Sequence, residues 1–213
     1  MQKKFIYFIL IFVIAAFAGI SGFLLANNVI KQPIIIKQAD VYPNPDSLPG
    51  IQTGNAPWLA EINNLQKRLS IIGLPALSQE GTALHTHQHL DIFINGNQVT
   101  VPANIGIDDA KGFLSPIHTH DTTGIMHVES PAVLKFYLGQ FFDIWGVRLT
   151  SSCIGGYCNT KDQILRIFIN GDLFTGDPRS IELLPHQEIV MTYGTILQLP
   201  FPTPHSYTFP AGY

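Results

Sequence analysis

Charged residues are scarce in this sequence, and this limits the partners that the protein can bind. Only 13% of the 213 residues are charged, and the formal net charge is −3. There is no basic stripe that could neutralise the phosphates of DNA or RNA, so we expect no nucleic-acid partner. Short runs rich in aromatic residues, Thr and Val favour β-rich globular material over a helical bundle.

Cysteine is limited to Cys153 and Cys158, which flank a glycine turn with Cys-x4-Cys spacing. In an oxidising compartment, such a lone pair most simply forms a disulfide. Two alternatives stay open at this point, namely a pair of metal ligands and a redox-active pair. A loop this short gains little stability from chain entropy, so a bridge here would mainly fix the local shape.

An apolar run near the N-terminus indicates the compartment. Lys3 and Lys4 precede 22 uncharged, mainly apolar residues over 5–26, and roughly 20 residues suffice for a helix to cross a bilayer. We predict a transmembrane helix over 1–26, which makes the chain a single-pass protein of the cell membrane with its C-terminal domain extracytoplasmic. The alternative is a cleaved signal peptide and a secreted protein, because Ala16-Phe17-Ala18 fits a cleavage site.

The rest of the chain divides by composition into three parts. Residues 27–57 are rich in Pro, Gly, Asn and Asp and predict an extended stalk. An extracytoplasmic α+β domain is expected over 58–199, and a proline-rich tail, extended over the surface, over 200–213. The domain opens with an apolar stripe of helical period over 58–72, which Gly73 ends.

Elsewhere in the domain the pattern is mostly that of strands. From Thr82 the apolar period is two, and Asn95-Gly96 is a strong hairpin signal before a return strand over 98–101. Ser130-Pro131 resembles a helix start, which predicts a buried helix over 132–145. Further strands are expected over 163–169, 173–175, 180–184 and 188–193. We therefore predict an α+β domain with a mostly antiparallel sheet and one buried helix packed against it.

Seven residues of the first hairpin recur later in the chain. Residues 90–96 (LDIFING) reappear as 165–171 (LRIFING) at an offset of 75, with six of the seven positions identical. Two hairpins that converged on one apolar pattern and a true duplication both explain this. The second copy has Thr160, Asp162 and Ile164 where the first has three histidines. The hairpin therefore does not need histidines to fold, which favours a functional role for them.

Six of the eight histidines lie between positions 85 and 127. They are His85, His87 and His89 in HTHQH, His118 and His120 in HTHD, and His127. Neutral imidazole is the commonest metal ligand in proteins, and residues spaced by two share one face of a strand. Two such repeats so close together predict a metal site. The remaining histidines, His186 and His205, stand alone and are expected at the surface.

One hairpin can bring three of these histidines together. Asp121-Thr-Thr-Gly124 has the composition of a turn. If it closes a hairpin, His118 faces His127 with Cβ atoms roughly 5 Å apart, and His120 lies on the same face. His118, His120 and His127 then suit a tetrahedral metal with one open position, and Glu129 lies next along that face.

The first repeat cannot supply three ligands to one ion. The Cα atoms of His85 and His89 would be about 13 Å apart on a flat strand, whereas ligand nitrogens lie about 2 Å from a metal. A pair from this repeat could join the other cluster, a second ion could bind, or one ring could orient a ligand. Asp91, Asp121 and Glu129 are candidates for orienting imidazoles or for a catalytic base, and are equally plausible as surface acids or turn formers.

The donor set narrows the choice of metal. All-imidazole ligation suits zinc and copper, and also nickel or iron. Neither Met nor Cys stands where a blue-copper site would need it, because Met126 should face away from its neighbour His127. We expect a divalent metal, Zn or Cu.

Three segments carry a family resemblance: residues 118–130, residues 138–148 and the Cys153-to-Cys158 loop. They resemble a family of uncharacterised membrane-anchored or secreted microbial proteins, and the similarity covers about residues 82–195. That family has no established activity, so the resemblance implies one exported domain and no catalytic residues.

These observations support three functional hypotheses. The first is a membrane-tethered extracytoplasmic protein that binds Zn or Cu through the histidine cluster for metal handling or sensing. The second is a three-His metalloenzyme for hydration or hydrolysis, with Glu129 or Asp121 as the base, although the His-Glu-x-x-His signature does not occur. The third is an envelope interaction module that binds a partner without metal.

Overall fold

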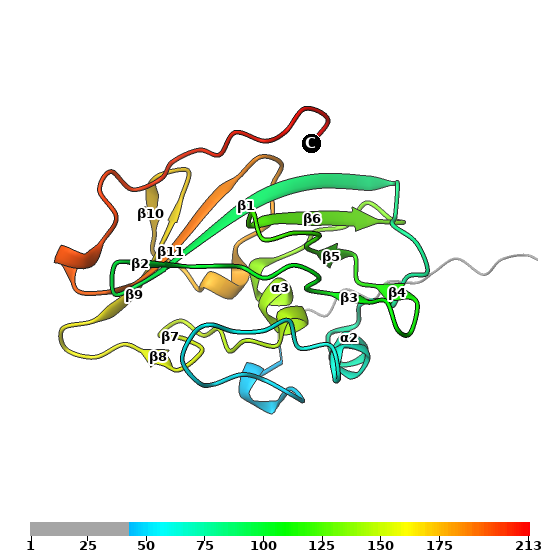
Figure 1. Cartoon of the computed structure of the whole chain (residues 1–213), viewed down its shortest axis with the longest axis horizontal. Helices are drawn as coiled ribbons and strands as arrows, with labels where there is room; N and C mark the ends of the chain where they lie inside the picture. The colour runs from blue at the N-terminus through cyan, green and yellow to red at the C-terminus, as the bar shows by residue number, and fades with distance from the viewer. Residues whose placement is uncertain (1–42) are drawn as a thin grey trace, which may run out of the picture. The chain divides into compact units, whose positions relative to one another are not determined.

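Strand β1 (Leu84–Ile94) lies inside the main sheet and determines its topology. The computed structural model describes residues 43–213, and the predicted anchor over 1–26 lies outside this range. Between residues 43 and 213 there is no helix long and apolar enough to cross a membrane. The strands follow the order β10-β9-β11-β1-β6-β5, and β2 also pairs with β1 (Figure 1).

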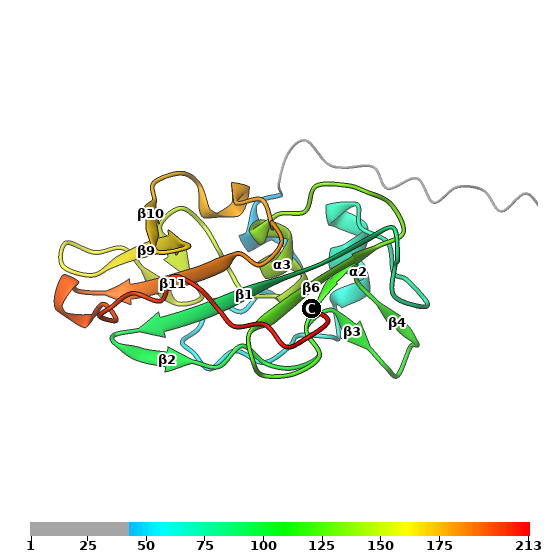
Figure 2. The ribbon, with the colours of Figure 1, turned by 90° about the horizontal axis from the view of Figure 1, so that it is seen from above.

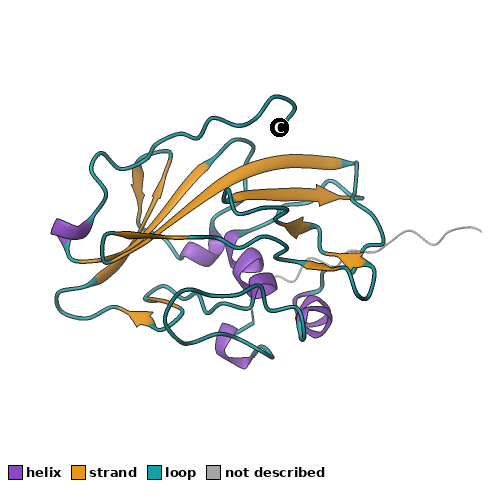
Figure 3. Ribbon diagram, viewed as in Figure 1, coloured by secondary structure: helices purple, strands orange, loops and turns teal. Residues whose placement is uncertain are grey.

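The remaining elements are short (Figure 3). The helices are α2 (Leu65–Ile72) and α3 (Leu138–Trp145), with 3-10 turns η1 (Pro45–Ser47), η2 (Pro178–Ser180) and η3 (Ile196–Gln198). The main sheet also contains β2 (Asn97–Val99), β5 (Ile117–His118), β6 (Ile125–Ser130), β9 (Ile164–Ile169), β10 (Asp172–Phe174) and β11 (Glu188–Gly194). Two small hairpins pair β3 (Ile107–Asp108) with β4 (Phe113–Leu114), and β7 (Cys153–Ile154) with β8 (Tyr157–Cys158).

The two halves of β1 have different neighbours. Residues 84–89 pair antiparallel with β6, whereas residues 89–94 pair parallel with β11. The other pairs of the main sheet are antiparallel. The prediction of an α+β domain with a mostly antiparallel sheet is therefore confirmed.

The two faces of the sheet are covered differently. Leu90 and Ile92 of β1 belong to one hydrophobic core with Phe141 and Phe142 of α3, so the helix covers this face. The tail (200–213) runs over the opposite face, as Figures 1 and 2 show. Side chains alternate along a strand, and the three histidines of β1 all occupy odd-numbered positions, so they point toward the tail.

The repeated segment forms a hairpin in both places. Asn95 and Gly96 have φ of 52° and 83°, and Asn170 and Gly171 have φ of 52° and 90°. Positive φ at both central positions is what a type I′ turn requires, and Asn and Gly tolerate it best. The Asn-Gly hairpin prediction is confirmed, with a shorter return strand than expected.

The first predicted helix begins later than its apolar stripe. Helix α2 starts at Leu65, not near Trp58, and ends as predicted at Gly73, whose φ is 72°. The backbone of residues 59–61 is committed to other segments: the Leu59 carbonyl accepts from Gln52 Nε2 at 2.9 Å, and Glu61 N–H donates to the Trp145 carbonyl at 3.2 Å. These groups are therefore unavailable for a helix.

The second predicted helix is also shorter than expected. Ser130 is the last residue of β6, not a helix cap, and α3 begins at Leu138. Residues 136–138 pair with residues 181–183, because Leu138 N–H donates to the Ile181 carbonyl at 2.8 Å and Leu183 N–H to the Phe136 carbonyl at 2.8 Å. In place of the strand predicted over 180–184, residues 181–183 form only this short pairing. All eight residues of α3 are buried.

The described part of the predicted stalk belongs to the domain. Leu48 is buried in the core, and Gln52 forms a β-bridge with Val147. The prediction of an extended stalk is therefore wrong for residues 43–57. The predicted disulfide is present, with the sulfur atoms of Cys153 and Cys158 2.14 Å apart across the β7–β8 turn.

Candidate metal centre

A row of histidines crosses three adjacent strands on the face turned toward the tail. His87 of β1 pairs with His127 of β6, and His118 of β5 pairs with the same His127. The ring centroids of His87 and His127 are 4.6 Å apart, and those of His118 and His127 are 5.4 Å apart. In the next row, His85 is paired with Glu129. The sequence predicted the His118–His127 pair but not the pairing of β1 with β6, which brings in the first repeat.

His120 follows β5 and completes the predicted triangle. Its Nε2 atom is 3.2 Å from His118 Nε2, and its ring centroid is 4.5 Å from that of His127. The loop that returns to β6 depends on Gly124, which has φ of +88° and whose Cβ, if present, would lie 2.6 Å from the Leu90 carbonyl oxygen. Only glycine fits such a close approach to a neighbouring strand.

The Glu129 carboxylate lies among these rings, and its side chain is only 3% exposed. Oε1 is 3.1 Å from His127 Nδ1 and 3.2 Å from His85 Nε2. Oε2 is 3.9 Å from His118 Nε2 and has no hydrogen-bond partner within residues 43–213. A buried carboxylate oxygen without a partner is costly, so a group that satisfies it would stabilise the centre.

Burial favours the neutral, metal-binding form of two rings. Desolvation, with help from the neighbouring rings, lowers the pKa of His118 and of His87 to about 4. For Glu129 burial opposes ionisation, but the His127 hydrogen bond and the charges of the surrounding rings outweigh it and lower the pKa to about 2. Near neutral pH these groups are therefore two neutral imidazoles and one carboxylate, which are the forms that coordinate metals.

Hydrogen bonds also orient two of the rings. His118 Nδ1 lies 3.0 Å from the carbonyl oxygen of Ser115, which can only accept. The Nδ1–H group of His118 must therefore donate, which leaves the Nε2 lone pair directed at His120 and Glu129. His127 Nδ1 meets the Glu129 carboxylate in the same way. Such second partners fix the tautomer and the orientation of metal-binding histidines.

Two overlapping sets of side chains have the spacing of metal ligands. One consists of His118, His120, His127 and Glu129, and the other of His85, His87, His127 and Glu129. Within each set, one ligand atom per residue lies within 4.8 Å of the others. His127 and Glu129 belong to both sets.

His89 is a predicted ligand that the structure places apart from these sets. Its Nδ1 is 2.8 Å from Glu188 Oε2, and its Nε2 is 2.9 Å from the Thr123 carbonyl oxygen. Both partners accept, so both nitrogens donate and neither offers a lone pair. Burial lowers the pKa of His89, but Glu188, Asp91 and the Thr123 carbonyl together outweigh it and raise the pKa overall. Although His89, Asp91 and Glu188 are close enough to hold an ion, they are better explained as a buried ion pair.

The predicted acids have different surroundings. Glu129 lies inside the centre, whereas Asp91 accepts from Gln98 Nε2 at 2.7 Å at the far end of β1. Asp121 is exposed, and its Oδ1 accepts from the backbone N–H of Thr123 at 2.9 Å and from the hydroxyl of that residue. Those two hydrogen bonds lower the pKa of Asp121. It therefore shapes the loop and orients no imidazole.

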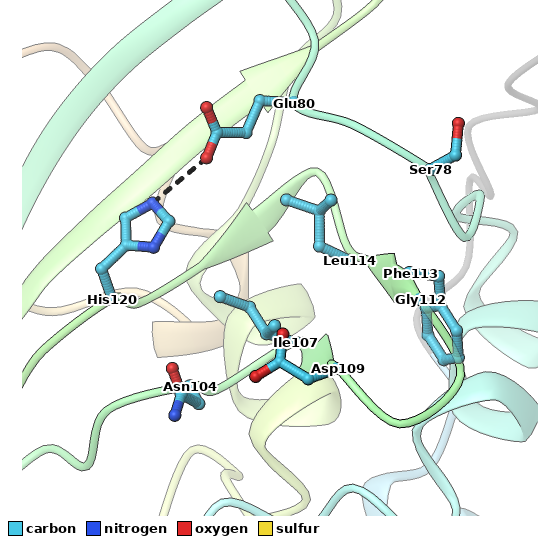
Figure 4. A pocket seen from close by; sticks show the side chains of 9 residues that line it. All are labelled: Ser78, Glu80, Asn104, Ile107, Asp109, Gly112, Phe113, Leu114 and His120. Carbon is cyan, nitrogen blue, oxygen red and sulfur yellow. Dashed lines mark ion pairs between the residues drawn. The ribbon is translucent and has the colours of Figure 1, made fainter.

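A pocket of about 400 Å³ opens beside His120. Figure 4 shows Glu80 directed at the ring, with its Oε1 3.4 Å from His120 Nε2. The remaining side chains of the pocket include Asn104 and Asp109. Glu80 was not predicted from the sequence, because it lies 40 positions before His120 in the chain and belongs to no motif.

A second pocket, of about 390 Å³, opens at the other repeat and is lined by His85, His87, His186 and Tyr213. Tyr213 lies on the centre, with ring centroids 4.5 Å from His87 and 5.4 Å from His127. His186 is exposed as predicted, and its Nε2 lies 3.0 Å from the Tyr213 carbonyl oxygen. The tail therefore covers part of the centre while leaving an opening at each repeat.

Comparison with protein-family models, with curated proteins and with solved structures gives no match for this chain. The family resemblance of the three sequence segments stays a prediction, and the function has to be argued from the centre itself.

Proposed function

We propose that this protein binds zinc or copper at the histidine centre and serves in metal handling or sensing. The observation that carries the proposal is the Glu129 carboxylate, which is buried among five imidazole rings and has one oxygen without a hydrogen-bond partner among residues 43–213. A cation at this position would satisfy that oxygen and use the lone pairs of the surrounding rings. A hydrogen-bonded structural cluster would leave the oxygen uncompensated.

The donor set supports the choice of metal. Imidazole nitrogens with one carboxylate oxygen suit Zn and Cu(II), whereas an all-oxygen set would be expected for Mg or Ca. Each ligand set offers at most three imidazoles and one carboxylate, the usual number for a four-coordinate metal.

The setting of the centre is proposed from the sequence. The apolar run over 5–26 would tether the domain to the cell membrane on its extracytoplasmic side. Metal handling or sensing there requires ions to enter and leave, and the pockets beside His120 and His87 provide access.

A second candidate is a metalloenzyme for hydration or hydrolysis. The pocket beside His120 favours it, because a small substrate could reach a metal-bound water there. Glu80 lines that pocket with its Oε1 3.4 Å from His120 Nε2 and would be the general base. A metal that retains a water ligand after loading would support the enzyme, whereas a readily exchanged ion would support handling.

The deciding experiment measures the metal bound by the full-length chain, purified in mild detergent and stripped with a chelator. We expect at least one Zn(II) or Cu(II) per chain after loading and desalting, and a higher melting temperature with the ion. His127→Gln with Glu129→Gln, which removes the two residues that belong to both ligand sets, should remove this binding, whereas His205→Gln, at an exposed position, should retain it. If the wild-type chain retains neither ion and gains no thermal stability, the proposal is wrong, and the interaction module without metal becomes the better explanation.

A further inference from the structure

The centre contains more ligands than one ion can use. Five imidazoles and one carboxylate face it, whereas zinc takes four ligands. The two His-x-His repeats also fall into separate ligand sets when all atoms must lie within 4.8 Å. Two ligand atoms on opposite sides of one ion can be only about 4 Å apart, because each lies about 2 Å from the metal. One ion therefore cannot bind the four histidines of both pairs at once.

In each repeat, two histidines place their Nε2 atoms next to each other. His85 Nε2 is 3.2 Å from His87 Nε2, and His118 Nε2 is likewise 3.2 Å from His120 Nε2. Nitrogens at this separation are close to the ligand spacing around a single tetrahedral ion, which is roughly 3.3 Å for bonds of about 2 Å. Little movement would be needed to receive an ion at either pair.

Glu129 lies between the two pairs and presents one oxygen to each. Oε1 is 3.2 Å from His85 Nε2, and Oε2 is 3.9 Å from His118 Nε2. Oε2, the oxygen directed at the second pair, has no hydrogen-bond partner in the described part of the chain. A carboxylate in this position can bind two cations at once, one through each oxygen.

We propose that the centre is dinuclear, with one ion at His85 and His87, a second at His118 and His120, and Glu129 bridging them. His127, which belongs to both ligand sets, completes the coordination of one ion. The separation expected between ions in two-metal sites is roughly 3.5–4 Å. Each ion keeps an open position for water or a small anion, reached through the pocket on its own side. This inference rests on the proposed function and assigns its stoichiometry and its bridging ligand.

The test loads the stripped full-length chain with Cu(II) and measures stoichiometry by elemental analysis together with the electron paramagnetic resonance spectrum. We expect two Cu(II) per chain, with a spectrum weakened and broadened by coupling between neighbouring spins. His85→Gln with His87→Gln should leave one Cu(II) per chain, with the full intensity of an isolated ion. His118→Gln with His120→Gln should do the same.

Two further variants make the experiment specific. Glu129→Gln preserves the shape of the side chain but cannot bridge two cations as a carboxylate does, so it should abolish the coupling. His205→Gln should keep two coupled ions, because His205 belongs to neither ligand set and lines neither pocket. Circular dichroism and thermal melting of each variant verify folding, and the wild-type measurement does not depend on any variant.

The outcomes separate this inference from the function on which it rests. No bound Cu(II), together with no bound Zn(II) in a parallel loading, overturns both. One Cu(II) per chain overturns the dinuclear centre and leaves the metal-binding function intact. Two ions whose spectrum shows no coupling, or coupling that persists in Glu129→Gln, overturn the bridging role of Glu129.

Discussion

The hairpins β1–β2 and β9–β10 use nearly the same seven residues, 90–96 and 165–171, yet only the first belongs to a candidate site. They flank β11, which pairs parallel with β1 on one side and antiparallel with β9 on the other. The apolar positions Leu90 and Leu165 are buried in both. The shared residues therefore form the same local structure and contribute to the same core.

The difference lies upstream of the shared residues. β9 begins at Ile164, one residue before the repeat, whereas β1 begins six residues before it, at Leu84. That extension carries His85 and His87 and pairs with β6, which supplies His127 and Glu129. The hairpin thus contributes to the core of the fold. The site forms because β1 extends beyond the hairpin and pairs with β6. Four predictions test this separation, beginning with the largest expected effect.

The histidines that β1 carries and β9 lacks should contribute strongly to the affinity for metal. His87→Gln removes a proposed ligand, so we expect the affinity of its site for Zn(II) or Cu(II) to fall by more than about 100-fold, since changing residues that merely orient ligands costs about 10–100-fold. Asp162→Asn, at the equivalent position before β9, is the matched control and should leave the affinity unchanged. Competition against a chromophoric chelator measures both, and equal affinities in the two variants would remove His87 from the site.

The shared apolar positions should matter to folding in both hairpins. Ile92 and Ile167 occupy equivalent positions and are 0% and 5% exposed. Ile92→Ala and Ile167→Ala should each lower the free energy of unfolding by about 2–5 kcal/mol. Urea denaturation of the metal-free chain checks this. A large loss for Ile92→Ala with none for Ile167→Ala would show that only the first hairpin supports the core.

Lowering the pH should destabilise the metal-free domain, and the effect should arise in the half of the sheet formed by β1, β6 and β5. The pKa of His118 is about 4 in the folded chain against 6.5 in the unfolded chain, so above pH 6.5 both states are neutral and the ring has no effect. As the pH falls from 6.5 toward 4, only the unfolded chain takes up the proton, and stability is lost. At pH 5 the loss is about 2 kcal/mol from this group.

Chemical denaturation at pH 7 and pH 5, with chelator present, measures this loss. His118→Gln should reduce the difference between the two pH values, whereas His205→Gln, which changes an exposed ring, should preserve it. An unchanged difference in His118→Gln would contradict the assignment of the acid sensitivity to this ring.

The smallest effects are expected at the two turn glycines. Gly96→Ala and Gly171→Ala place a side chain at φ of +83° and +90°, which costs about 1 kcal/mol of unfolding free energy. A Cβ at Gly96 would find its nearest contact at 3.4 Å, whereas one at Gly171 would lie 2.8 Å from His205 Cβ. Gly171→Ala should therefore cost slightly more, because the tail must shift. Thermal melting compares the two, and a reversed order would show that this tail contact contributes nothing.

Much of the local structure was predictable because neighbouring residues determine it. The period of two in β1, the positive φ at the Asn-Gly turns and the Cys153–Cys158 bridge all follow from residues close together in the chain. The helix boundaries were not predictable in this way. Residues before α2 and α3 give their backbone hydrogen bonds to distant segments, and propensity cannot anticipate that competition.

The site divides in the same manner. The turn at Asp121-Thr-Thr-Gly124 was enough to predict that His118 and His127 face each other, since a hairpin is a local structure. Strand geometry also predicted that the three histidines of the first repeat cannot share one ion, but the sequence did not determine that His89 is the one set apart. It did not identify Glu188 or Glu80 as the partners of His89 and His120.

By itself, the sequence determined that histidines gather in two short repeats and that one hairpin can align three of them. Only the tertiary structure decided that β1 lies beside β6, which places His85 and His87 against Glu129 and turns two clusters into one centre. The physical reason is that strand pairing over long sequence separation depends on which edges and apolar faces remain available after the whole chain has packed. Local sequence patterns determine on which face of a strand each imidazole lies, whereas the packing of the whole sheet determines which side chains lie beside it.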